Sequence, residues 1–253
     1  MTDKVHQLVL ELFTRKDVRW ARKNFLATVR RLIEETGAKS VLEIGGGRTP
    51  AFGKDDIERL GISYTSNDIS ARELSLAPDW ASKAHFDIAT KDQRVIGDFA
   101  GKYDVVFSHM VMEHVGDYRQ AYRNIHKILA PGGIAISYHP VLFALPFVAN
   151  LLLPTRVSDS ILRAIRPHRT DWGRPKFPAH YSGCFISGKV QRNIQDMGFR
   201  NVWQVPFYGH NYYNKVPGLR QAHGAVSKLI GKLGISPLAA FSYTIAKKEG
   251  RAG

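Results

Sequence analysis

The sequence predicts an α/β fold in which a mainly parallel β-sheet has helices on both faces. Two observations lead to this class. Short apolar runs rich in β-branched residues, which predict buried strands, alternate with segments of helical spacing through the first 140 residues. One such run, residues 40–44, ends in the three glycines Gly45, Gly46 and Gly47. A strand, a glycine turn and a following helix make the first βα unit of a nucleotide-binding sheet.

Two helices are expected in the first 36 residues, before the glycine turn. The second is predicted from Arg19 to Thr36. Asp17 can cap its start, and Gly37 ends it. Apolar residues recur in it near the helical period, at Trp20, Phe25, Val29, Leu32 and Ile33. Residues 1–36 are therefore expected to form a helical cap that covers the edge of the sheet.

An acidic residue, Glu43, stands just before the glycine turn. Two classes of cofactor compete for such a turn. A dinucleotide fingerprint, G-x-G-x-x-G, would need a glycine where this chain has Pro50, and a carboxylate repels a pyrophosphate. S-adenosylmethionine (SAM) has no phosphates and has a cationic amino acid end. The acid therefore favours SAM over a dinucleotide.

This stretch resembles the first motif of the class I SAM-dependent methyltransferases, which is an acid followed by G-x-G-x-G. Gly45 and Gly47 match the motif, and Thr49 replaces its third glycine. The resemblance covers residues 38–140 well and the remainder loosely. It implies a Rossmann-like methyltransferase sheet of seven strands with helices on both faces. It also implies that SAM is the cofactor and that Glu43 and the glycines bind it. In the family, the segment that corresponds to the N-terminal helices also helps to close over the cofactor, so residues 1–36 either do this or only cover the edge of the sheet.

The second strand, predicted within residues 62–70, contains an acid near its end. Asp68 stands about 23 residues beyond Gly45, at the tip of the strand next to the first. From there a carboxylate can accept hydrogen bonds from both hydroxyls of a ribose. A lone aspartate at a strand end more often caps the next turn, but the glycine motif favours the ribose role here. We assign Asp68 and the adjacent Ile69 to the cofactor site.

A third short strand is predicted at residues 84–88, and it also ends with an acid. In the resembling family, an acid at this position contacts the adenine amino group, and the next apolar residue packs on the ring. The matching residues here are Asp87 and Ile88. The resemblance therefore places both of them at the adenine.

The fourth strand is predicted at residues 103–109 and lies beside the first in this topology. Residues at the carboxyl end of such a strand face the cofactor, so Ser108 and His109 are expected to touch SAM or the acceptor. The following segment, residues 110–115, resembles the post-strand signature of the family. Within it, His114 either acts as a general base or orients the loop by hydrogen bonding to backbone.

No metal is expected at this site. Family members that ligate a divalent ion in this segment have an extra acid where this chain has Met110. Glu113, His114 and the distant His180 are the remaining candidates for ligands, and they make a weaker set.

The segment 129–133 resembles the L-x-P-G-G turn of the family. Proline and glycine stop a helix and reverse the chain, so the motif identifies the fold and says little about the acceptor. The other predicted elements are a helix at 121–129, a strand at 134–138, a helix at 187–197, a strand at 200–207 and a final antiparallel strand at 238–247.

Two insertions are expected to cap the carboxyl end of the sheet within a methyltransferase domain at 37–253. The first, at about 139–185, begins with an apolar run of about 13 residues, which is too short to span a membrane. A basic segment follows this run. The insertion then ends near residues 177–182, which resemble the P-x-Y-Y lid of small-molecule and glycan methyltransferases. Tyr181 in this lid is a candidate catalytic residue that acts by orientation.

The second insertion, at about 209–236, contains a predicted amphipathic helix. One face of this helix is apolar, with Leu219, Val226, Leu229, Ile230 and Leu233, and another is basic, with Arg220, Lys228 and Lys232. Such a helix either packs on the core or lies in a membrane interface. Together with the first insertion it makes an anionic membrane surface a candidate partner.

The charge of the chain is unevenly distributed. Its 253 residues have a net charge of +14 and are enough for one sizeable α/β domain. Residues 141–253 contain 16 Lys and Arg against 4 Asp and Glu, whereas the first 140 contain 20 against 18. This asymmetry indicates an anionic partner, either a membrane surface, a nucleic acid or an acidic substrate, or else it only confers solubility.

The single cysteine, Cys184, cannot form an internal disulfide, which favours a reducing compartment. The N-terminus is charged at Asp3 and Lys4 and has no apolar signal core. A cytoplasmic protein is therefore expected. Its basic second half would allow it to associate with the cytoplasmic face of a membrane.

These features predict methyl transfer from SAM to a small-molecule, lipid-linked or glycan acceptor, at oxygen, nitrogen or carbon. The candidate catalytic residues are His109, His114 and Tyr181. The alternatives are an RNA methyltransferase that uses the basic half, or a non-catalytic protein with the same fold. Nucleic acid is the less favoured partner, because no N-P-P-Y-type motif follows the fourth strand and Cys184 lacks a preceding proline. The sequence does not identify the acceptor or the oligomeric state.

Overall fold

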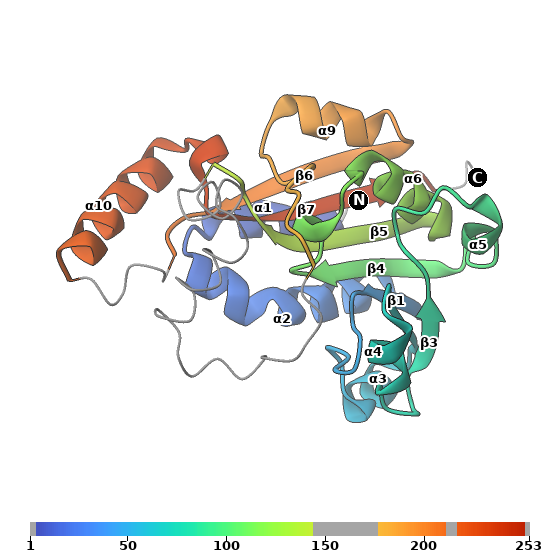
Figure 1. Ribbon diagram of the computed structural model, residues 1–253. Helices are drawn as coiled ribbons and strands as arrows, with labels where there is room; N and C mark the ends of the chain where they lie inside the picture. The colour runs from blue at the N-terminus through green and yellow to red at the C-terminus, as the bar shows by residue number, and fades with distance from the viewer. Residues whose placement is uncertain (1–3, 144–176, 211–216, 251–253) are drawn as a thin grey trace.

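The computed structural model describes residues 4–143, 177–210 and 217–250 and contains a seven-stranded sheet of order β3-β2-β1-β4-β5-β7-β6 (Figure 1). The strands are β1 Ser40–Ile44, β2 Ser63–Asp68, β3 Ser82–His85, β4 Tyr103–His109, β5 Leu129–Pro140, β6 Phe199–Phe207 and β7 Phe241–Lys248. Strands β1 to β5 pair in parallel, and β7 is antiparallel to both of its neighbours, β5 and β6. The predicted fold class, a mainly parallel sheet of seven strands, is confirmed.

Helices cover both faces of this sheet (Figure 1). They are α1 Lys4–Thr14, α2 Val18–Thr36, α3 Lys54–Leu60, α4 Ala71–Ser75, α5 Gln93–Gly97, α6 Tyr118–Ile128, α9 Gly188–Gln195 and α10 Pro217–Leu233, with short 3-10 turns η1 Met112–His114 and η2 Ser236–Leu238. Helices α1 and α2 contact β6 and β4, and helices α6 and α9 contact β5 and β6. The core lies between these layers and the sheet.

Helix α2 is fixed to the middle of the sheet, at β4. The Asp17 side chain accepts a hydrogen bond from the Arg19 N–H at the start of α2, and Gly37 ends the helix with a left-handed φ of 65°. Phe25 of α2 is fully buried, and its ring packs 5.4 Å from that of His109 and 5.3 Å from that of Tyr243, centroid to centroid. The second turn of α2 therefore lies against the carboxyl end of β4.

The carboxyl ends of three strands are tied together by one asparagine. The backbone N–H groups of Gly45 and Gly46 donate to the carbonyl of Asn67, at 2.8 and 3.0 Å. The side-chain nitrogen of Asn67 donates in turn to the carbonyls of Ala84 and Phe86, each at 2.9 Å. Asn67 is almost fully buried, so these bonds have no competition from water. The glycine turn is therefore held in place by the neighbouring strand β2 and, through it, by β3.

Several predicted boundaries differ from the structure, and three of the differences have a clear local feature. Strand β3 ends at His85, because the Asp87 carboxylate accepts from the Ala89 N–H and starts a turn there. Strand β5 begins at Leu129 and continues through the P-G-G segment, where its register with β4 shifts before Ile134. The last strand starts at Phe241, because the turn η2, with a proline in its first positions, occupies the preceding residues.

Parts of both predicted insertions lie outside the described residues. These are 144–176, which include most of the apolar run and the basic segment, and 211–216. The predicted helix of the second insertion is present as α10. Within the described part of the chain, no helix is both long enough and apolar enough to cross a membrane.

Candidate cofactor and active site

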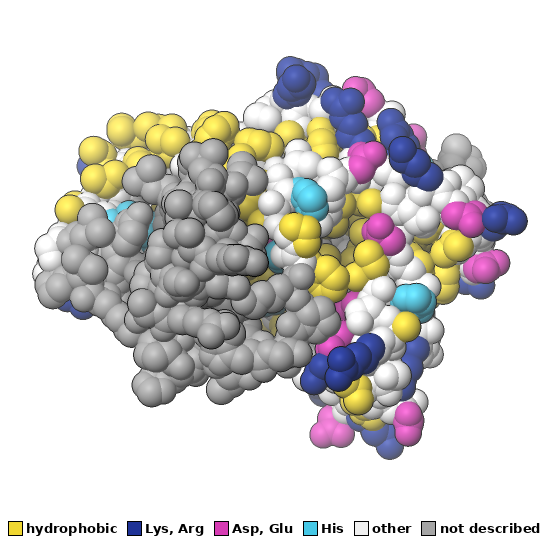
Figure 2. Space-filling view, in the orientation of Figure 1, with side chains coloured by type: hydrophobic (Ala, Val, Ile, Leu, Met, Phe, Trp, Pro, Cys, Tyr) yellow, Lys and Arg dark blue, Asp and Glu magenta, His cyan; other side chains and the backbone are white. Residues whose placement is uncertain are grey.

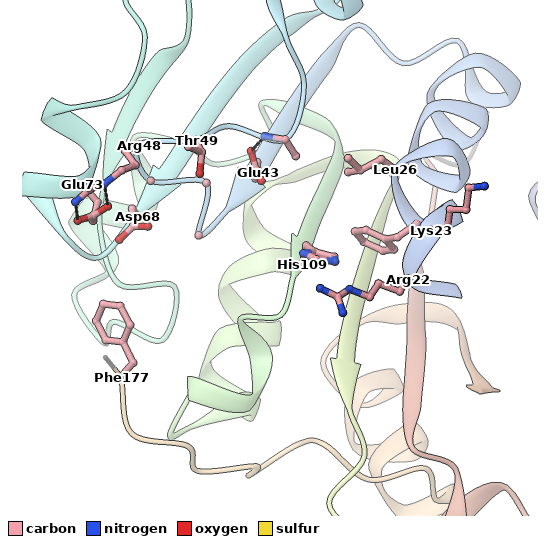
Figure 3. Close-up of a pocket in the computed structure, with 15 residues that line it drawn as sticks. Arg22, Lys23, Leu26, Glu43, Arg48, Thr49, Asp68, Glu73, His109 and Phe177 are labelled. Carbon is pink, nitrogen blue, oxygen red and sulfur yellow. Dashed lines mark hydrogen bonds and ion pairs between the residues drawn. The ribbon is translucent and has the colours of Figure 1, made fainter. Parts of the chain in front are cut away.

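A cavity of about 500 Å³ lies at the carboxyl ends of β1, β2 and β4, beside α2 (Figure 3). Its lining residues are Arg22, Lys23, Phe25, Leu26, Glu43, Gly45, Gly46, Gly47, Arg48, Thr49, Ala51, Asp68, Glu73, His109 and Phe177. Six residues that the sequence assigned to the cofactor or to catalysis are therefore together in one cavity: Glu43, the three glycines, Asp68 and His109.

Glu43 is the buried acid of this cavity and is only 4% exposed. Its Oε2 accepts hydrogen bonds from the Ala51 N–H, at 2.9 Å, and from the Tyr64 hydroxyl. Burial disfavours the charged carboxylate more than these donors favour it, and it raises the pKa of Glu43 to about 7. The negative charge of Asp68 adds to this increase. Near neutral pH, Glu43 is therefore present in both protonation states.

The glycines keep the wall of the cavity free of side chains. Gly45 has a φ of 78°, and a Cβ there would lie 2.4 Å from a methyl group of Val111. A Cβ on Gly46 would lie 2.3 Å from the Ser66 hydroxyl oxygen. Any larger residue at Gly45 would be both strained and blocked. The turn therefore needs glycine for its backbone conformation and for the space next to the cavity.

Asp68 both begins a turn and faces the cavity. Its Oδ1 accepts from the Ser70 N–H at 2.8 Å, as expected of an aspartate at a strand end. Its Oδ2 is the atom nearest to a Cβ built on Gly47, at 3.0 Å, so this oxygen lies beside the glycine turn. Partial burial raises the pKa of Asp68, and the nearby Glu73 raises it further. The turn-forming and ligand-binding interpretations of Asp68 are therefore compatible.

An ion pair that the sequence analysis missed closes one side of the cavity (Figure 3). The guanidinium of Arg48 donates to both carboxylate oxygens of Glu73, at 2.6 and 2.5 Å. Glu73 is only 7% exposed, and its backbone N–H donates to the Ser70 hydroxyl. Ser70 and Glu73 have the spacing of a helix capping box, which was the available signal for a residue fixed at this point. The partner of Glu73 was not apparent from local sequence.

His109 is the titratable group of the cavity that suits proton transfer. Its ring packs 5.4 Å from the rings of both Phe25 and Tyr138, centroid to centroid. Shielding by these surroundings lowers the pKa of His109 below its ordinary value, and the positive charge of Arg22 lowers it further. The imidazole is therefore neutral at pH 7 and can accept a proton.

Four predicted cofactor residues do not line this cavity. Ser108 is 2% exposed and Ile88 is 4% exposed, so both belong to the core. Ile69 is 50% exposed. Asp87 is exposed, and its carboxylate accepts from the Ala89 N–H at 2.8 Å. Their roles at the cofactor remain predictions.

The other two predicted catalytic residues hold the lid segment against η1. The His114 Nδ1 lies 3.1 Å from the Pro178 carbonyl oxygen, and Phe177, the residue just before Pro178, lines the cavity. Tyr181 is 3% exposed, has a φ of 52°, and donates its N–H to the Glu113 carbonyl at 3.0 Å. The backbone role that the sequence allowed for His114 is therefore present, and the general-base role remains a prediction.

Glu113, the acid among the metal candidates, is buried in the structure. Glu113 is 4% exposed, and burial raises its pKa to about 8, so it is mainly protonated at neutral pH. Its Oε2 has no hydrogen-bond partner among the described residues. Within the same described residues, no group of three His, Cys, Asp or Glu side chains is close enough to hold a metal ion.

The sequence matches the methyltransferase domain family over residues 6–203. A ubiquinone biosynthesis O-methyltransferase of Caulobacter sp. (strain K31) is 30% identical over 145 residues, which are 51% of this chain and 56% of that protein. An uncharacterized methyltransferase of Mycobacterium sp. (strain JLS) is 28% identical over 190 residues, 73% of each chain.

Among solved structures, that of the DszA carbon methyltransferase has a TM-score of 0.54 and 15% sequence identity, over 91% of this chain and 55% of that one. At this identity the likeness shows the fold alone. The matched region covers about half the length of the first curated relatives. The family match spans the glycine turn, the acidic strand end and the histidine that line the cavity. The chain belongs to the class I SAM-dependent methyltransferases.

Proposed function

We propose that this protein transfers the methyl group of SAM to a hydroxyl oxygen of a lipophilic acceptor, which it meets at a membrane surface. The observation that supports transfer to oxygen is the position of His109. It is a neutral histidine that lines the same cavity as the glycine turn and the two acids Glu43 and Asp68. A hydroxyl acceptor has to lose a proton, and this residue can take it.

The described residues fit SAM as the occupant of the cavity. Two carboxylic acids, Glu43 and Asp68, offer oxygen acceptors to a ligand with a cationic end and ribose hydroxyls. The glycine turn adds backbone without side chains, and a Cβ on Gly45 or Gly46 would collide with neighbouring atoms. When bound, SAM supplies an electrophilic methyl group on a good leaving group. The protein's main task is therefore to align the acceptor.

His109 and Arg22 have different roles at the acceptor. Both line the cavity, and the charge of Arg22 contributes to the lowered pKa of His109 (Figure 3). His109 at the carboxyl end of β4 accepts the proton that the acceptor hydroxyl releases. The guanidinium of Arg22 stabilises negative charge that develops on the acceptor oxygen. This pairing distinguishes transfer to oxygen from transfer to an amine, where a positive charge would develop beside Arg22.

The lipophilic acceptor is supported by the relatives and by the surface of α10. Two relatives that match about half of this chain are named for ubiquinone biosynthesis, whose product is a lipid. Val226, Leu229 and Leu233 of α10 are 54%, 57% and 62% exposed. Figure 2 shows hydrophobic side chains gathered over this helix. Another apolar residue of this helix, Ile230, packs instead on the small core with Tyr208, so the helix is attached to the body while its outer face is open.

The basic second half gives this apolar face an electrostatic complement. Residues 141–253 contain 16 Lys and Arg against 4 Asp and Glu. Each basic residue near an anionic lipid surface contributes about 1 kcal/mol to binding, and inserted apolar side chains add a part that salt does not screen. Binding of RNA by the same charges would instead be strongly weakened by salt, and a gel shift at two salt concentrations would reveal it.

Replacement of Asp68 by asparagine is expected to weaken SAM binding by roughly 1.5–3 kcal/mol, because a charged acceptor is lost. The amide oxygen can still accept from the Ser70 N–H, so the turn and the melting temperature should be preserved. Calorimetric titration with SAM measures the effect. The control is Asp98→Asn, at an exposed acid outside the cavity. Equal SAM affinities of Asp68→Asn and the wild type, in folded proteins, would rule out the ribose role.

Glu43 is expected to make stability fall with rising pH. Its pKa is raised from 4.5 to about 7, so the folded chain keeps a proton that the unfolded chain releases within this window. Stability then decreases from pH 4.5 to 7 and stays lower above pH 7, by on the order of 3 kcal/mol. Glu43→Gln keeps an acceptor for Ala51 and Tyr64 but does not titrate.

Urea unfolding of the SAM-free protein between pH 5 and 8 measures this difference. The wild type should lose stability relative to Glu43→Gln across the window, whereas its SAM affinity should rise through pH 7 as the carboxylate forms. The affinity of the variant should change less with pH. Parallel unfolding curves of the two proteins at every pH would contradict the buried titration.

His109→Gln is expected to lower kcat roughly 10²- to 10⁴-fold, since it removes the proton acceptor, while SAM binding changes little. In the wild type, the rate should fall as the pH drops through the lowered pKa of His109, and this limb should disappear in the variant. Transfer of labelled methyl from SAM to prenylated and unprenylated phenols measures the rate. His114→Gln is the comparison, because that ring holds the lid backbone. A larger kcat loss in His114→Gln than in His109→Gln would reverse the assignment.

The triple variant Val226→Gln, Leu229→Gln, Leu233→Gln is expected to bind equimolar phosphatidylglycerol and phosphatidylcholine vesicles at least tenfold more weakly. Each inserted side chain contributes about 1.5–3 kcal/mol when fully buried. Vesicle sedimentation at low and high salt measures this. The control is Leu10→Gln, Leu76→Gln, at exposed leucines on other elements. Negligible pelleting of the wild type would contradict membrane binding through α10 and favour a water-soluble acceptor.

A further inference from the structure

A second cavity, of about 850 Å³, lies beyond the carboxyl end of β6, between the start of α2 and the helix α10. Its lining residues are Lys16, Asp17, Val18, Arg19, Tyr208, Gly209, His210, Arg220, His223, Gly224, Ser227, Lys228, Gly231 and Lys232. None of them lines the cofactor cavity. Five of the lining residues are Lys or Arg, against the single acid Asp17, so the cavity has a strong positive charge.

The single acid that lines this cavity is already in an ion pair. Asp17 forms an ion pair with Arg19, at 2.9 Å, and also accepts from the backbone N–H at the start of α2. Lys16, Arg220, Lys228 and Lys232 form no ion pair with any carboxylate of the described residues. The positive charge of the cavity is therefore not balanced by the described part of the chain.

Helix α10 concentrates its basic residues on the wall of the cavity. Arg220, Lys228 and Lys232 follow a spacing of four or eight residues, so their side chains lie on one face of the helix. Lys228 and Lys232 are four residues apart, and like charges at that spacing repel and destabilise a helix. An anion bound between them would remove this repulsion. The apolar residues of α10 do not account for this arrangement, because they lie on a different face.

Tyr208 lines the same cavity and has a buried hydroxyl group. It is 6% exposed, and its hydroxyl has no hydrogen-bond partner among the residues that the structure describes. Its ring lies so close to α10 that a Cβ on Gly231 would be 3.1 Å from it. A buried hydroxyl without a partner costs free energy that a bound acceptor would recover.

Backbone hydrogen bonds hold Lys16 and the start of α2 next to this tyrosine. The Tyr208 N–H donates to the Lys16 carbonyl at 2.7 Å, and the Val18 N–H donates to the Tyr208 carbonyl at 3.2 Å. The loop before α2 and the end of β6 are therefore fixed to each other. The cavity is built from three elements, and Tyr208 and several basic residues line it together.

We propose that this cavity binds a phosphate group of a second ligand, with Arg220, Lys228 and Lys232 neutralising its charge and the Tyr208 hydroxyl donating to an oxygen. Phosphate fits because it has several acceptor oxygens and up to two negative charges. The site does not depend on methyl transfer. Its ligand is either a phospholipid head group or a water-soluble phosphate monoester, and both present the same chemical group.

Two probes separate these sources. Dihexanoyl phosphatidic acid, kept below its micelle concentration, presents a phosphate monoester with acyl chains, and glycerol 3-phosphate presents it without them. Calorimetric titration at constant ionic strength should show saturable one-to-one binding of at least one probe. Tighter binding of the diacyl probe assigns the site to lipid, and equal binding assigns it to a soluble monoester. Absence of saturable binding of both probes would overturn the proposal.

Variants test whether the binding occurs in this cavity. Arg220→Gln, Lys228→Gln, Lys232→Gln should weaken binding at least thirtyfold, and Tyr208→Phe, which removes only the hydroxyl, about fivefold. The matched control removes the same charges from exposed positions elsewhere, as Lys102→Gln, Arg123→Gln, Lys189→Gln, and should stay within twofold of the wild type.

Equal losses in the two triple variants would overturn the proposal, because they would show only long-range attraction. Unchanged phosphate binding by Tyr208→Phe would overturn the role of the hydroxyl. If the cavity triple variant does not fold, Tyr208→Phe alone tests whether the phosphate binds in this cavity. SAM affinity is measured on every protein. A variant that loses phosphate but keeps SAM binding separates this site from the cofactor site, so failure of one proposal leaves the other intact.

Discussion

The cofactor site depends on the burial of one carboxyl group beneath a glycine turn. Glu43 points from β1 into a space that is shielded by the turn and by Tyr64, and its pKa of about 7 reflects the cost of charging it there. The arrangement persists because Asn67 fixes the turn from the next strand. A cationic ligand group near this acid would stabilise the charged form. The fold thus holds an acid in a state that a positively charged ligand favours.

The sequence was sufficient where the signal was local. Strand β1, the glycines and Asp68 lie within about 30 residues, and each has a spacing set by strand length and turn geometry. Strand periodicity also explains one residue that was placed at the cofactor but does not line the cavity. Successive side chains of a strand point to opposite faces, so His109 faces the cavity while Ser108 enters the core. Ile69 follows the last residue of β2, and its side chain is exposed to solvent.

Residues that come from separate elements were not predictable from sequence. Arg48 and Glu73 meet only because α4 returns beside the glycine turn, and Arg22 reaches the cavity because Phe25 fixes α2 against β4. Asp87 and Ile88 were predicted from a strand that ends three residues earlier than expected. The amphipathic pattern of α10 was visible in the sequence. Its orientation was not, because helical periodicity gives the faces and only packing decides which one is covered.

Helix α2 lines both cavities, and this limits how the chain can be shortened. Its first residues line the basic cavity, its second turn lines the cofactor cavity, and the Tyr243 hydroxyl of β7 donates to the Ala21 carbonyl between them. A chain trimmed to begin at residue 37 would keep every strand and the whole glycine turn, yet both cavities would lose a wall. The N-terminal helices are therefore not a detachable accessory. Shortened or fused versions of this protein should preserve them as part of the minimal functional unit.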